Sequence, residues 1–179
     1  TFITTEQQVR ATYQIDPRST VYIGYKGYES SNLLDEAIAG APIEDFSSRF
    51  FILGGGYLKP QNRKLFPVKT AILLDAGIGS RKNENKPEDQ LGVETTLNNI
   101  FNLNYRNSIF VQNKTGVLFS ENYLVNELYR FGGINSIRGF DENSIDASLY
   151  SVLSTEYRYL FGEDIYVHSI IDLGYFENK

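Results

Sequence analysis

Apolar and polar residues alternate along most of this chain, which is the period expected of β-strands. Between Gln7 and Ile15, the polar side chains take the even positions and the odd positions hold Val9, Ala11, Tyr13 and Ile15. The stretch from Phe66 to Arg81 behaves in the same way, with the even-numbered residues from Phe66 to Ile78 on one face. The pattern predicts an all-β fold.

Further segments continue this alternation. Together they predict eight strands, at about residues 7–15, 21–25, 46–58, 66–81, 91–103, 106–119, 145–161 and 164–176. In 46–58, one face holds Phe46, Phe50, Ile52 and Leu58, and the glycines 54–56 indicate a bend or close packing. Many of these strands exceed the usual length of about five or six residues. Their lengths suit tilted strands that cross a bilayer, which need about 9–11 residues.

The predicted connections alternate between short and long. The short ones are 16–18, 59–64, 104–106 and 161–163, and the long ones are 30–44, 82–90 and 120–144. This alternation is typical of an antiparallel barrel in an outer membrane. The charged residues 82–90 read as a solvated loop. We therefore predict a transmembrane antiparallel β-barrel, with a soluble all-β domain as the alternative.

Composition narrows the classes of function. The net charge of −5 argues against a nucleic-acid partner, which would need a basic face. The chain has no cysteine, so disulfides and thiolate sites are excluded. Its 13 Tyr and 12 Phe suit the aromatic girdles of a barrel as well as an ordinary core and surface. The chain has no run of about 18 apolar residues, so no membrane helix is predicted. We expect residues 1–179 to be part of one barrel domain in a longer protein.

The connection at 120–144 is unusual for an outer loop, which should be polar. It places apolar side chains and glycines around a single arginine, Arg138. These residues are Gly132, Gly133, Ile134, Ile137, Gly139 and Phe140. Glycine permits unusual backbone angles and close approach. The composition indicates a loop that folds inward and packs, although a surface turn with a stray hydrophobe is the alternative.

The two strands after this loop carry charged residues on their even-numbered, lumen-facing positions. Glu156 and Arg158 lie on the first strand, and His168 and Asp172 lie on the second. A guanidinium group matches carboxylates in geometry. We therefore expect Arg138 to pair with Asp172, Glu156 or both. In the alternative, Glu156 pairs only with Arg158, and Asp172 is solvated.

Nothing else in the sequence demands chemistry. His168 is the only histidine and builds no convincing Ser–His–Asp triad. The carboxylates of Asp75, Glu94, Glu156 and Asp172 could pair for hydrolysis, but no spacing requires it. Asp141, Glu142 and Asp146 show no calcium-loop signature. The residues predict no enzyme, no cofactor and no metal site.

The loop and the strands after it resemble a known family. Phe131-Gly132-Gly133 followed by Ile137-Arg138-Gly139-Phe140 resembles the Gly-Gly … Arg-Gly-Phe motif of the BamA/TamA outer-membrane insertase superfamily, which includes two-partner secretion transporters. Glu156-Tyr157-Arg158 and Asp172-Leu173-Gly174 resemble its next two strand motifs, in the same order. The resemblance covers about residues 126–176.

The resemblance implies a sixteen-stranded barrel, of which this chain supplies the sixth to thirteenth strands. It implies that Arg138, on the tip of an inward-folded loop, meets Glu156 and Asp172, with Arg158 and Gly174 in supporting positions. The implied function is the insertion of β-barrel proteins in the outer membrane of a Gram-negative cell. The implied partners are outer-membrane lipid, unfolded client proteins and periplasmic accessory proteins. A secretion transporter of the same superfamily and a passive porin or receptor barrel are the alternatives.

Overall fold

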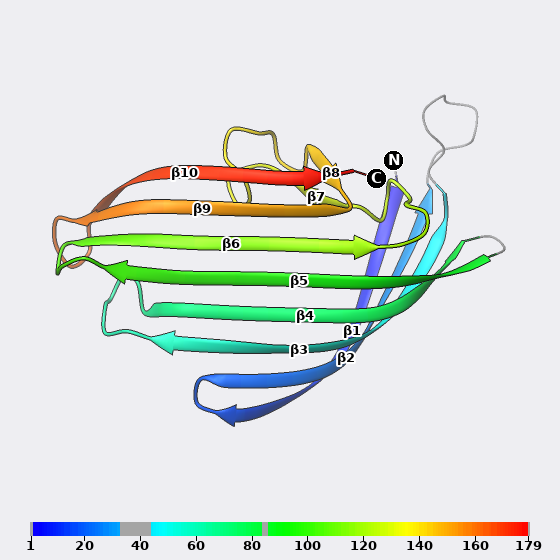
Figure 1. The fold of residues 1–179 in the computed structure, drawn as a ribbon, viewed down its shortest axis with the longest axis horizontal. Helices are drawn as coiled ribbons and strands as arrows, with labels where there is room; N and C mark the ends of the chain where they lie inside the picture. Colours follow the sequence, from blue (N-terminus) through cyan, green and yellow to red (C-terminus); the bar gives the residue numbers. More distant parts are fainter. Residues whose placement is uncertain (1, 33–43, 84–85, 179) are drawn as a thin grey trace.

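A computed structural model describes residues 2–32, 44–83 and 86–178. The described residues form only strands and their connections (Figure 1). The strands are β1 (Phe2–Asp16), β2 (Ser19–Asn32), β3 (Phe46–Pro60), β4 (Val68–Asn83), β5 (Lys86–Asn102), β6 (Asn107–Phe119), β7 (Tyr129–Phe131), β8 (Ile145–Ala147), β9 (Leu149–Leu160) and β10 (Tyr166–Glu177).

Eight long strands form one antiparallel sheet in the order β1-β2-β3-β4-β5-β6-β9-β10. The short strands β7 and β8 form a separate pair within the connection from β6 to β9. Figure 1 shows that the eight-stranded sheet is strongly curved. It is open, with β1 and β10 at its two edges. The prediction of an all-β, antiparallel fold is confirmed, and the barrel remains a prediction.

The two faces of the sheet differ in character. The outer face presents exposed apolar side chains, among them Ile23, Phe51, Leu53, Ile78, Leu97, Ile171 and Leu173. The inner face is the one that the connection 120–144 covers, and it buries polar and charged side chains, among them Ser48, Arg81, Gln90, Ser108, Ser154, Glu156 and Arg158. In β3 the residues singled out from the sequence, such as Phe46 and Phe50, are buried on the inner face, whereas Phe51 and Leu53 point outward.

The start of the fourth strand differs from the sequence prediction. β4 begins at Val68, and Phe66 does not continue its outer face. The Phe66 ring packs edge-on against Tyr166 at 4.9 Å, and the Arg158 guanidinium lies 4.3 Å from its centre. The turn between β3 and β4 thus folds this aromatic ring inward, where Arg158 offers a cation–π contact.

The charged segment 82–90 is wrongly predicted as a long loop. β4 continues to Asn83 and β5 starts at Lys86, with Arg81 paired opposite Glu88. Arg81 and Glu88 face each other with opposite charges, which favours strand pairing, so a charged composition does not oppose pairing here. The expected connection at 30–44 also begins later, because β2 extends to Asn32, and residues 33–43 lie outside the described part of the chain.

The predicted strand 145–161 is divided in two. Residues 145–147 form β8 and pair with β7, and the main sheet resumes at Leu149. Ser148 lies between them, and its backbone still bonds to Leu118 of β6 and Glu177 of β10. Ile145 is buried beneath the connection, whereas Leu149 pairs with Val117 in the sheet. Alternation alone could not reveal this change of partner.

Within the described ranges, no helix has the length and apolar character needed to cross a membrane.

Candidate functional site

The connection 120–144 packs onto the inner face through a small apolar cluster. Phe131, Ile137, Ile145, Ala147 and Val152 are all buried in it, and Tyr150 packs against them. The rings of Phe131 and Tyr150 stack at 4.9 Å. Burial of this kind stabilises a docked loop by about 25 cal/mol per Å² of apolar surface. The cluster explains why a connection of this length carries apolar residues.

Three glycines shape this connection. Gly132, Gly133 and Gly139 have φ angles of +123°, +89° and +95°, which L side chains rarely adopt. A side chain at Gly132 or Gly133 would also collide, with the Asp141 carbonyl or with Glu142 respectively. The Gly132 amide donates to the Ser136 hydroxyl at 2.8 Å, which closes a tight turn just before Arg138.

Arg138 lies against Asp172 of β10. Its Nε donates to Asp172 Oδ2 at 2.7 Å and its Nη2 donates to Oδ1 at 2.9 Å. The Arg138 backbone amide donates to Oδ2 as well, at 3.1 Å. A bidentate pair with an added amide bond fixes both the side chain and the backbone of the loop tip. We call this group, with Glu156, the tip latch.

Glu156 of β9 lies at the centre of the surrounding charges. Its Oε1 is 3.7 Å from Arg138 Nη1, and its Oε2 accepts from Arg158 Nε at 2.8 Å. His168 Nδ1 is 3.3 Å from the same Oε2. Glu156 therefore bonds mainly to Arg158 and only weakly to Arg138. The Arg158 guanidinium also lies over the rings of Phe66 and Phe110, 4.3 and 4.2 Å from their centres.

The neighbours of Arg138 in its motif take different positions. Ile137 is buried, and a Cβ added to Gly174 would lie only 2.7 Å from its Cδ1. The absence of a side chain at Gly174 thus makes room for Ile137. Phe140 is half exposed on the connection, and Gly139 has open space around it.

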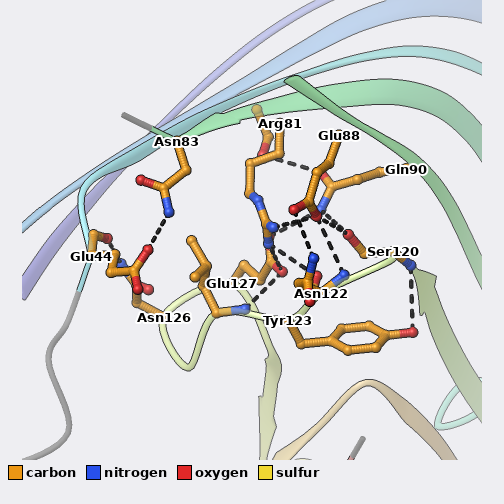
Figure 2. Close-up of polar contacts among 12 residues, drawn as sticks. Glu44, Arg81, Asn83, Glu88, Gln90, Ser120, Asn122, Tyr123, Asn126 and Glu127 are labelled. Atoms are coloured by element: carbon orange, nitrogen blue, oxygen red, sulfur yellow. Dashed lines mark hydrogen bonds and ion pairs between the residues drawn. The ribbon is translucent and has the colours of Figure 1, made fainter. Parts of the chain in front are cut away.

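A second polar cluster holds the other end of the connection (Figure 2). Arg81 of β4 bonds to Glu127 of the connection and, at 2.6 Å, to Glu88 of β5. The Arg81 side chain is only 2% exposed and that of Glu127 only 5%. Glu127 accepts from Gln90 Nε2 at 3.0 Å and from the Leu124 amide at 2.9 Å. We call Arg81, Glu88 and Glu127 the base clasp.

Glu88 also binds the start of the connection. Asn122 donates to Glu88 through its side-chain amide at 2.9 Å and through its backbone amide at 3.3 Å. These bonds, with the nearby Arg81 charge, hold the pKa of the Glu88 carboxyl below its ordinary value. Glu88 precedes Leu91, where the exposed apolar residues of the outer face of β5 begin.

The same end of the connection also contacts β2, which lies next to the edge strand β1. Asn126 donates to the Ser30 hydroxyl of β2 at 2.8 Å and to the Glu44 carbonyl at 3.0 Å. Beneath it, a cavity of about 370 Å³ lies on the inner face, lined by Lys26, Tyr28, Glu94, Leu128, Tyr129 and others. The connection thus bridges β2 to β10 without filling the space below it.

Comparison with known proteins gives no family assignment. No family model matches the chain, and no curated protein matches it. In the described ranges, no group of three or more acidic or histidine side chains is arranged to hold a metal ion. Asp146, considered for calcium from the sequence, lies 3.1 Å from Arg130 instead.

The structure brings most of the sequence-selected residues together. Arg138, Glu156, Asp172, Arg158, Ile137 and Gly174 lie in one group, and Gly132 and Gly133 shape the adjoining turn. Phe140 remains half exposed, and Gly139 has open space around it. The base clasp was missed. Its signal in the sequence was the pair of opposite charges at Arg81 and Glu88, which lie opposite each other in the β4–β5 ladder.

Proposed function

We propose that this chain is part of a transmembrane β-barrel in the outer membrane of a Gram-negative cell. We further propose that the barrel inserts other β-barrel proteins, as in the BamA/TamA superfamily. In this proposal both edges of the open sheet pair with further strands of the same barrel, because unpaired strand edges are not tolerated in lipid.

The observation that carries the proposal is the contact of Arg138 with Asp172. The resemblance implied an arginine on a long loop that meets carboxylates on two specified strands. Arg138 forms a bidentate pair with one of them, Asp172, and lies 3.7 Å from the other, Glu156. An unrelated sheet has no reason to bring a loop arginine to both residues of these motifs.

The two faces of the sheet support a membrane location. Outward apolar residues extend along strands of 12–17 residues in the eight-stranded sheet. The opposite face buries charges, which suits a lumen. A large exposed apolar surface is unusual on a soluble monomer and marks a contact with lipid or protein.

The proposed mechanism involves no covalent chemistry. The barrel disturbs the bilayer locally and offers a strand edge on which a client strand can pair. The tip latch holds the inner loop against the barrel wall during this process. Its partners are outer-membrane lipid, unfolded client proteins and periplasmic accessory proteins.

Depletion of the full-length protein, followed by measurement of the whole outer-membrane proteome, tests the function. We expect a broad loss of unrelated barrel proteins. Loss of a single secreted protein, with other barrels unchanged, would favour a secretion transporter of the same superfamily. If neither the barrel proteins nor a secreted protein is lost, the passive porin or receptor barrel is favoured.

A complementation assay then tests the site. A full-length protein carrying Arg138→Ala should fail to restore the barrel proteins, whereas Arg49→Ala should restore them. Arg49 is an exposed arginine on the outer face of β3 and belongs to no part of the site. Full restoration by Arg138→Ala, at equal protein level, would count against the latch.

A further inference from the structure

Beyond the tip latch, the connection 120–144 has a second charged attachment at its other end. The base clasp joins the neighbouring strands β4 and β5, through Arg81 and Glu88, to Glu127 of the connection, which is distant from both in sequence. The tip latch uses β9 and β10 instead. The two groups share no residue among their charged contacts, so each can hold the connection without the other.

The base clasp is built as a buried site and differs from the surface ion pairs of this chain. Lys64 and Asp164 also pair, but both side chains are mostly exposed. Arg81 is almost fully enclosed and donates to two carboxylates and to the Asn122 carbonyl at 3.2 Å. An exposed pair contributes little, whereas a buried pair that loses one member leaves an uncompensated charge.

Each member of the base clasp also fixes backbone. Glu127 accepts from the Leu124 amide, and Glu88 accepts from the Asn122 amide. The segment 122–127 is thus bound from both sides and held to the β4–β5 hairpin, as Figure 2 shows. The chain then passes into β7, which pairs with β8 and leads to the glycine turn before Arg138.

We infer that Arg81 is a positioning residue that holds the base of the connection, independently of the contacts by which Arg138 holds its tip. This inference deepens the proposed function and rests on it only for the assembly assay described below. Release of the whole connection then requires both attachments to open, whereas loss of either one frees only its own end.

Reporter cysteines can test this directly, because residues 1–179 contain no cysteine, and any cysteine elsewhere in the full-length protein is first replaced by serine. Leu128→Cys reports on the base and Ile137→Cys on the tip, since both side chains are buried. The full-length protein in membranes is treated with a maleimide, and the labelling rate is compared between backgrounds. Labelling of a buried thiol follows the population of the locally open state.

Arg81→Gln should raise labelling at position 128 by roughly tenfold or more, because it leaves buried carboxylates unpaired. Labelling at position 137 should change much less. Arg138→Ala should give the reverse pattern. Arg49 is a matched, exposed arginine on the neighbouring strand, so Arg49→Gln should change neither rate. Arg81→Lys should give an intermediate rate, because an ammonium cannot match the geometry of a guanidinium with two carboxylates.

The double variant Arg81→Gln with Glu127→Gln should label no faster at position 128 than the Arg81→Gln single variant, since the two residues act together. Equal labelling at both positions in every background would show one cooperative unit and overturn the inference. Unchanged labelling at position 128 in Arg81→Gln would also overturn it.

The outcome for the proposed function can be separated from this result. If the labelling pattern is as expected but depletion of the full-length protein leaves the outer-membrane proteome intact, the two attachments stand and the insertase proposal fails. If assembly of outer-membrane proteins depends on Arg138 but the labelling rate at position 128 is the same in Arg81→Gln and wild type, the insertase proposal stands and this inference fails.

Discussion

At the scale of single residues, the site depends on what a guanidinium can do that an ammonium cannot. Arg138 uses Nε and Nη2 on the two oxygens of Asp172, and its Nη1 points to Glu156. Arg81 divides its donors in a similar way between Glu127 and Glu88. The planar group with fixed donors lets one side chain join two strands or a strand and a loop.

The first prediction concerns Arg138. Arg138→Ala should weaken docking of the connection by about 2 kcal/mol, since a charge-assisted bidentate pair and its alignment of the backbone are lost. Arg138→Lys should recover only part of this. The rate of limited proteolysis within 130–144 measures the effect. Arg130→Ala is the control, and its half-exposed pair with Asp146 should contribute about 1 kcal/mol or less. Equal proteolysis in Arg138→Ala and wild type would contradict the prediction.

The second prediction separates two glycines. Gly133→Ala should disturb the connection more than Gly139→Ala, although both have positive φ. The strain of a left-handed conformation costs about 1 kcal/mol or more at either site. Gly133 has the added collision with Glu142, whereas Gly139 has open space. Proteolysis of the connection in the two variants provides the comparison, and the same rate in both would mean that packing at Gly133 is irrelevant.

At the scale of elements, the β4–β5 hairpin shows how charge can support a strand pair. Arg81 lies opposite Glu88, and Gly79 lies opposite Gln90. The side chains on the inner face then meet the connection from β6, so the extended hairpin becomes its docking surface. The polar end of a strand pair is thus stabilised by its contacts, although its composition resembles a loop.

The third prediction follows from the lowered pKa of Glu88. A carboxyl whose pKa falls on folding stabilises the folded state above its ordinary pKa of about 4.5, and this stabilisation is lost as the pH falls through the lowered value. The base clasp should therefore open in acid. Tyr123→Trp provides a reporter, since the chain has no tryptophan. Its fluorescence should change below about pH 4.5, and Glu88→Gln should reduce that change. An identical acid transition in both proteins would exclude Glu88 as its source.

The fourth prediction concerns the contact between β10 and the connection. Gly174→Ala should cost about 1–3 kcal/mol of docking, because the new methyl group meets Ile137 Cδ1. Ile137→Val removes that atom, so the double variant should recover part of the loss. The labelling or proteolysis of the connection reports the difference. No recovery in the double variant would show that this close contact does not cause the effect.

At the scale of the whole molecule, the two faces of the sheet differ in the surroundings that suit them. The outer face carries exposed Ile, Leu and Phe side chains over most of its strands. The inner face buries charges under a connection that reaches from β2 to β10. Such an arrangement inverts the usual placement of apolar and polar groups in a soluble sheet, and a surrounding bilayer would explain it.

The fifth prediction tests that environment. Leu53 is 64% exposed on the outer face, so in water Leu53→Lys should be nearly neutral. In a bilayer it should cost about 2–4 kcal/mol. Thr12→Lys, on the inner face of β1, is the matched control. Folding yields of the full-length protein in lipid vesicles should fall for Leu53→Lys and not for Thr12→Lys. Equal yields for both would argue against lipid contact at Leu53.

The sequence by itself determined the alternating faces of the eight long strands and selected the residues of the tip latch as candidates. Period-2 alternation is a local property of each strand, so the eight long strands could be predicted without knowing their partners, although several of their ends could not. The even positions of the next two strands place Glu156 and Asp172 on the inner face, but this pattern left the partner of Arg138 open, and the family resemblance is what implied the pairing.

Only the tertiary structure decided which elements meet. The base clasp joins residues from β4, β5 and the connection, and no local pattern relates Arg81 to Glu127. In the same way, Ile145 continues the alternation of β9 and yet pairs with Phe131 of β7. These outcomes depend on which surface covers which, and that is set by the packing of the whole chain.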